Sequence, residues 1–107
     1  MSRDSIKIAA LNDAFRANMK DGRLFITAGL VGRPDLEQIL AKVRSFDQFN
    51  EDNNPFGERD FGALEHEGER IFWKLDYYDL DLRNGSPDPA DPAVTSRVLT
   101  IMLAEEY

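Results

Sequence analysis

A chain of 107 residues forms one domain with a modest core and is too short for two, and its 42% hydrophobic content excludes wholesale disorder. The absence of cysteine excludes disulfides, thiolate metal sites and a Cys nucleophile. The net charge of −7 argues against direct binding to nucleic acid or to an anionic membrane surface, because either would need many Lys and Arg side chains.

The first half of the chain predicts two helices with a strand between them. Apolar residues at helical spacing predict a helix over residues 5–19. The β-branched and aromatic run at 23–27 predicts a short strand. Pro34 lies where the first turn of a helix tolerates proline, and the apolar residues after it predict a second helix that ends near Phe46 or Phe49.

Two strand-like runs meet at Glu67-Gly68, which predicts a β-hairpin with a two-residue turn. In that register Leu64 pairs with Ile71. Alternation with a period of two then gives the hairpin one dry face and one charged face. The dry face comprises Leu64, Ile71, Trp73, Leu75 and Tyr77, and the charged face comprises Glu65, Arg70, Lys74 and Asp76.

The last part of the chain predicts a third helix. Asp91 is a predicted N-cap with Pro92 at the first helical position, and the apolar residues after them form a wide stripe. The predicted order of elements is therefore α-β-α-β-β-α in a single α+β domain that covers residues 1–107. We expect a three-stranded, mostly antiparallel sheet with the helices packed on one face.

The acidic residues are concentrated in one part of the chain. Between Asp47 and Asp91 there are 13 Asp and Glu against four Lys and Arg, whereas residues 1–46 carry a net charge of +3. Like charge gathered in one segment attracts partners of the opposite sign over long distances. We therefore expect the partner to be a basic protein surface.

The N-terminal segment lacks the apolar core of a secretory signal. No stretch approaches the roughly 18 apolar residues of a membrane span. We therefore expect a cytoplasmic protein that does not associate with a membrane.

Several runs of the sequence are distinctive: Trp73-Lys74-Leu75-Asp76-Tyr77-Tyr78-Asp79, Pro87-Asp88-Pro89-Ala90-Asp91-Pro92, and the runs at 8–16, 56–62 and 98–103. Together they resemble an uncharacterised bacterial family of small acidic proteins, a domain of unknown function found mainly in alphaproteobacteria and often on plasmids or in prophage-like regions. The resemblance covers nearly the whole chain and implies no known activity. It implies a setting of mobile elements, where small acidic proteins that inhibit host defence are a recurring class.

His66 is the only histidine, so any catalytic scheme that needs a base poised near neutral pH would have to use it. Its acidic neighbours, Glu65, Glu67 and Glu69, favour the charged imidazolium, which is the wrong form for a general base. We therefore predict a solvated residue at the tip of the hairpin.

The best candidates for a metal site or a glycosidase-like carboxylate pair are Glu58, Asp60, Asp76, Asp79 and Asp81. The acidic region fits no known calcium loop, since an EF-hand that starts at Asp47 would place Asp52 where glycine is required. We therefore predict no bound metal, no cofactor and no catalytic residue. A small hydrolase that depends on carboxylates or a metal remains an alternative.

The preferred hypothesis is a non-enzymatic inhibitor whose carboxylates imitate nucleic-acid phosphates and occupy the basic channel of a host-defence nuclease or DNA-binding complex, as in anti-CRISPR or anti-restriction proteins. The predicted binding residues are Glu58, Asp60, Glu65, Glu67, Asp76, Tyr78, Asp79 and Asp81. Most of these acids should form one contiguous patch if they are a mimic, and should scatter over all faces if they serve only solubility. A homodimeric structural module, joined through the exposed face or edge of the hairpin, is a further alternative.

Overall fold

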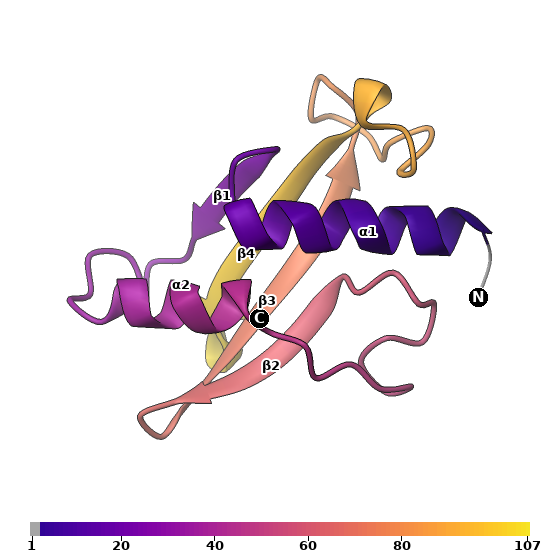
Figure 1. The fold of residues 1–107 in the computed structure, drawn as a ribbon. Coiled ribbons are helices and arrows are strands. Elements are labelled where there is room, and N and C mark those ends of the chain that lie inside the picture. The colour runs from indigo at the N-terminus through magenta and orange to yellow at the C-terminus, as the bar shows by residue number, and fades with distance from the viewer. Residues whose placement is uncertain (1–2) are drawn as a thin grey trace.

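The fold is built on a four-stranded mixed sheet (Figure 1). The computed structural model describes residues 3–107. The strand order across the sheet is β1-β4-β3-β2. β1 runs parallel to β4, and the other neighbouring strands are antiparallel. The strands are β1 (Arg23–Ile26), β2 (Phe61–His66), β3 (Glu69–Tyr78) and β4 (Ser96–Leu103). β1 and β2 therefore form the two edges of the sheet.

β2 and β3 form the predicted hairpin, and its register is confirmed. Leu64 pairs with Ile71, and Glu67 and Gly68 form the turn. Both turn residues have a left-handed backbone, with φ of 50° and 82°, as a type I′ hairpin turn requires. The predicted dry face points into the core, where its members are buried or partly buried: Leu64, Ile71, Trp73, Leu75 and Tyr77.

The predicted third helix is wrong, because residues 96–103 form strand β4 in the middle of the sheet. The cap is in place, since Asp91 accepts a hydrogen bond from the Ala93 backbone at 2.9 Å, but it begins only the 3-10 turn Pro92–Val94. Residues on both faces of β4 are buried, so its apolar run lacks a period of two and fits a buried helix or a buried strand equally well. The segment forms a strand because it pairs with β1 on one side and with β3 on the other. The predicted three-stranded sheet and the predicted order of elements are therefore wrong as well.

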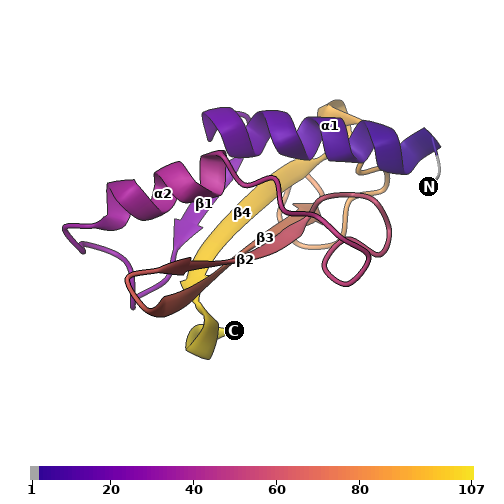
Figure 2. The same ribbon diagram turned by 60° about the horizontal axis from the view of Figure 1, so that its bottom comes forward.

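Two helices, α1 (Arg3–Asn18) and α2 (Leu36–Arg44), lie on the same face of the sheet (Figure 2). Both helices were predicted, and the α+β class is confirmed. No helix within residues 3–107 is long and apolar enough to span a bilayer. The largest fully buried apolar side chains between the two layers are Phe15, Leu30, Ile39, Val43, Ile71, Trp73, Leu99 and Ile101.

Trp73 fixes the residue that can stand opposite it in the hairpin. Its indole is fully buried and lies against Gly62, its pairing partner on β2. A Cβ at Gly62 would come within 2.6 Å of an indole carbon, so only glycine fits there without a shift of the ring. The close approach keeps the edge strand β2 tight against β3.

The second face of the sheet carries no α-helix within residues 3–107. We call this surface the open face; its residues include Phe25, Phe61, Ala63, Phe72, Lys74 and Asp76. The 3-10 turn η2 (Ala104–Glu106) is held beside it, because Glu106 accepts hydrogen bonds from the Thr27 hydroxyl at 2.6 Å and from the Gly29 backbone at 2.9 Å. This contact brings Tyr107 to the aromatic residues of the open face.

Candidate functional site

A groove of about 730 Å³ curves round the free edge of β2. One wall is the open face beside β2 and β3, and the other wall is the segment 46–56 that follows α2. Asp60, at the start of β2, also lines the groove. Ligand pockets in proteins commonly measure ~300–1,000 Å³, so this groove is large enough for a peptide segment or a small molecule.

Aromatic rings form the floor of the groove on the open face. The ring centroids of Phe61 and Phe72 are 5.2 Å apart, and the ring of Tyr107 lies 6.1 Å and 5.7 Å from them. On the opposite wall Phe56 is 74% exposed. Exposed aromatic rings offer large apolar contact areas of the kind that anchor protein interfaces.

Three of the predicted carboxylates, Glu58, Asp60 and Asp76, interact electrostatically where the groove reaches the start of β2. Burial raises the pKa of Asp60, and the nearby charges of Glu58 and Asp76 raise it further. Asp76 has a cation of its own, because the Lys74 ammonium lies 2.7 Å away, and Glu58 accepts a hydrogen bond from the Tyr77 hydroxyl at 2.9 Å. Asp60 has no ion pair with any Lys or Arg among the side chains that the structure describes, those of residues 4–107.

The remaining predicted binding residues lie at the two ends of the hairpin. Glu65 and Glu67 lie at the turn, whereas Tyr78, Asp79 and Asp81 lie at the end of β3 and just beyond it. Arg70, the partner of Glu65, is six positions from Asp76, or about 20 Å along the strand. Asp79 accepts a hydrogen bond from the Arg83 backbone at 3.0 Å, which lowers its pKa and ties it to its own turn. The predicted set is therefore divided between two places.

His66 is 3% exposed, so the prediction of a solvated residue is wrong. His66 is two positions after Leu64 on β2, and side chains two positions apart on a strand point to the same face. The His66 side chain therefore points toward the helical layer, as that of Leu64 does. There its Nε2 lies 3.2 Å from Asp35 Oδ2, and Arg33 donates to the same carboxylate oxygen at 2.8 Å. The arginine lowers the pKa of Asp35.

Asp35, His66 and Glu67 are the one group of His, Asp and Glu in residues 3–107 whose ligand atoms lie close enough to share a metal ion, within 4.8 Å. None of the five acids considered for a metal belongs to it. The Arg33 guanidinium already bonds Asp35, and Nδ1 of His66 has no hydrogen-bond partner, whereas metal-binding histidines normally donate from their second nitrogen. The arrangement therefore fits an ion-paired structural contact better than a metal centre.

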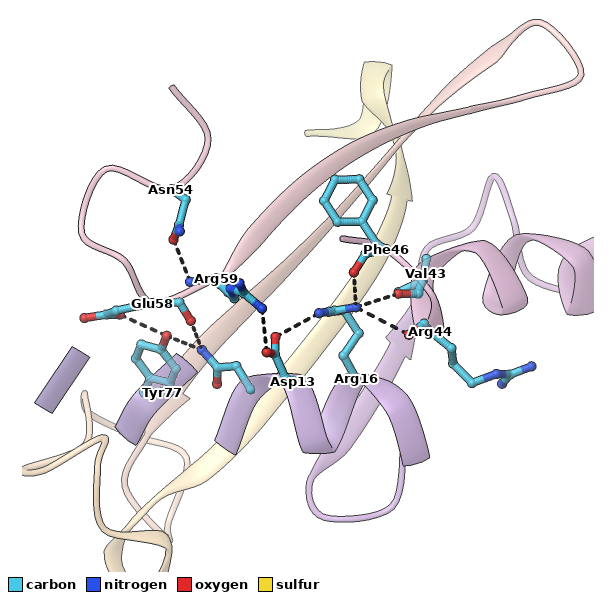
Figure 3. Close-up of polar contacts among 10 residues, drawn as sticks. Asp13, Arg16, Val43, Arg44, Phe46, Asn54, Glu58, Arg59 and Tyr77 are labelled. Carbon is cyan, nitrogen blue, oxygen red and sulfur yellow. Dashed lines mark hydrogen bonds and ion pairs between the residues drawn. The ribbon is translucent and has the colours of Figure 1, made fainter. Parts of the chain in front are cut away.

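Arg16 holds the segment after α2 against α1, a role that was not predicted from the sequence. Its buried guanidinium donates to the backbone carbonyls of Val43 at 3.1 Å and Phe46 at 2.9 Å (Figure 3). The guanidinium carbon lies 4.9 Å from the centroid of the Trp73 ring, and Asp13 pairs with the same group at 2.9 Å. Arg16 thus fixes the start of the 46–56 wall of the groove.

Asn12 holds the chain just beyond the other end of that wall, at Glu58. Its side-chain amide donates to the Glu58 backbone carbonyl at 3.0 Å and to the Tyr77 hydroxyl at 2.8 Å, and its carbonyl accepts a hydrogen bond from Arg97 at 2.9 Å. The signal in the sequence is that Asn12 and Arg16 follow Ile8 at four-residue steps, on the buried face of α1. Polar residues at core positions of an amphipathic helix indicate a buried network.

Comparison with known proteins identifies a family and no characterised relative. No curated protein and no solved structure matches the chain. The model of a family described as "Protein of unknown function (DUF3768)" matches residues 23–106, which include the whole sheet and most of the groove. Because the match covers most of the 107 residues, the chain belongs to the DUF3768 family of proteins of unknown function.

Proposed function

We propose that this protein is a non-enzymatic interaction protein that binds a Lys- or Arg-bearing segment of a partner protein in the groove beside β2. The proposal rests on the combination of a groove, an aromatic floor and a carboxylate without a cation of its own. A basic segment would bring that cation and would cover the exposed rings. At such interfaces large apolar side chains usually anchor the centre, and charged side chains surround them at the rim.

Asp60 is the observation that carries the proposal. A half-buried carboxylate beside Glu58 and Asp76 is unfavourable in the free protein, because burial and like charge both penalise its ionised form. Proteins keep destabilising arrangements of this kind mainly at functional sites. An incoming Lys or Arg would remove the penalty, so the cost in the free protein becomes affinity in the complex.

The narrower form of the proposal is that the partner is a host-defence nuclease or DNA-binding complex, and that the acids take the place of nucleic-acid phosphates. The net charge of −7 supports it, because a strongly negative protein is steered toward a basic channel. The same proposal places the protein in the cytoplasm, as predicted from the sequence. A captured partner that duplex DNA displaces from the groove would support the mimic, and a partner that DNA leaves bound would contradict it.

The experiment that tests the broader proposal is selection of a random dodecapeptide library against the protein. We expect the selected peptides to be basic and to bind the Asp60→Asn/Asp76→Asn variant at least about tenfold more weakly. The matched control is Asp4→Asn/Glu37→Gln, which removes the same charge from exposed positions on the two helices. Binding that falls equally in both variants would show a general charge effect and would contradict a site in the groove.

A further inference from the structure

We propose that the partner segment binds as an extended strand added to the free edge of β2. This inference deepens the proposed function and rests on it. The occupant is a stretch of a partner protein in which Lys or Arg alternates with apolar residues. Such a segment pairs with a sheet edge through its backbone, while its side chains occupy the pockets on either side.

The backbone of β2 leaves hydrogen-bonding groups directed away from the sheet. In an antiparallel pair only alternate residues exchange hydrogen bonds with the neighbouring strand. The bond from the Leu75 N–H to the Asp60 carbonyl, at 2.8 Å, sets this alternation, so the even-numbered residues bond to β3. Phe61, Ala63 and Glu65 therefore direct their N–H and C=O groups to the free edge.

Only part of this edge is covered. The Lys42 ammonium, from α2, donates to the Glu65 carbonyl at 3.0 Å. The outward groups of Phe61 and Ala63 have no hydrogen-bond partner within the described residues 4–107. Natural sheet edges are usually protected by proline, by an inward charge or by a covering segment, and the stretch 61–63 has none of these.

The edge has room beside it along its length. The groove runs past Phe61 and Ala63, and a second hollow of about 420 Å³ lies between residues 63–65 and residues 45–48. An extended chain rises about 3.3 Å per residue, so a segment of about six residues would follow the whole of β2. Its side chains would alternate between the aromatic floor and the 46–56 wall.

Charge selects a partner protein over a second copy of this chain. Asp47, Asp52 and Asp60 line the two hollows and make no ion pair within residues 4–107. None of the three cations that line the same hollows pairs with these acids: Lys74 is paired with Asp76, Lys42 donates to the Glu65 carbonyl, and Arg70 lies over the Phe72 ring. A basic segment complements these acids. A second copy would bring an identical acidic edge, and the two chains would repel each other.

The probe is a capped hexapeptide of alternating Lys and Val, with two N-methylated forms that carry methyl groups on the three Lys amides or on the three Val amides. Alternate amides of an added strand point toward β2 and away from it. We therefore expect one methylated form to bind at least about tenfold more weakly than the parent and the other to bind within about threefold of it. Hydrogen exchange should slow at the Phe61 and Ala63 amides when the parent peptide binds, while Gly62 and Leu64, already bonded to β3, change little.

Three results would overturn the inference: no binding of the parent peptide, equal effects of the two methylated forms, or unchanged exchange at Phe61 and Ala63. Protection of these amides that rises with protein concentration alone would assign the edge to a second copy instead. If the peptide loses affinity for Asp60→Asn/Asp76→Asn but both methylated forms behave alike, the groove binds basic segments without strand addition. If the charge-removing variant has no effect on any selected peptide, the proposed function itself fails.

Discussion

Replacing Arg16 by methionine tests whether the buried polar network supports the wall of the groove. The change keeps an apolar stem on the Trp73 ring and removes the donors to Val43 and Phe46. A hydrogen bond from a charged group contributes roughly 1.5–3 kcal/mol, so two such bonds contribute about 3–6 kcal/mol. Part of this is offset because methionine needs no desolvation, a cost that also lowers the pKa of Arg16. We expect a net loss of about 3 kcal/mol in the free energy of unfolding.

The assay is urea unfolding followed by tryptophan fluorescence. Trp73 is the only tryptophan, and it is fully buried beneath Arg16, so its emission reports the region that the substitution changes. Lys7→Met is the matched control, because Lys7 is exposed on the same helix. We expect it to change the free energy of unfolding by less than about 0.5 kcal/mol.

The reasoning is refuted if Arg16→Met and Lys7→Met have the same stability. A loss near 3 kcal/mol with full retention of peptide binding would refute only the link between the network and the groove. We expect both effects together, because one of the two carbonyl groups released by the substitution, that of Phe46, is where the 46–56 wall begins.

Three further predictions use the same unfolding assay. Gly62→Ala should cost about 1–3 kcal/mol by forcing a side chain against Trp73, whereas Gly85→Ala should be neutral, since nothing lies near its Cβ; equal effects would contradict the packing. Glu67→Asn should stabilise the hairpin by about 1 kcal/mol, because Asn tolerates the left-handed backbone, and a loss would contradict the turn. Asp60→Asn should be more stable than the natural protein at pH 7. A raised pKa in the fold penalises the ionised carboxylate, so this advantage should vanish below pH 3.8, and an advantage that persists there would contradict the assignment.

Local patterns were enough to predict the hairpin. Gly68 marks the turn, and the alternation from Leu64 and across to Ile71 fixes which face is buried, so register and core face follow from nearest neighbours alone. The two helices were predicted for the same reason. Asp60 and Asp76 could be named as candidate site residues because their charge is visible in the sequence.

The errors arose where distant segments decide the structure. Residues 96–103 become a strand because β1 and β3 pair with both of its edges, and no local pattern contains those partners. His66 is buried and contacts Asp35, 31 positions away in the sequence, although it is next to a hairpin turn. Asn12 was passed over because its apolar neighbours account for a helix without it. Its role depends on the hydrogen bond to the Tyr77 hydroxyl, which only the folded structure brings within reach.

The central claim is that the groove beside β2 is the binding surface of this protein. Amide chemical shifts, recorded while a selected basic peptide is added, test it most directly. We predict that the largest changes fall on residues 60–63, on Phe72 and on the segment 46–56, with the outer surfaces of α1 and α2 unaffected. Changes centred on the two helices, with the groove unaffected, would contradict it.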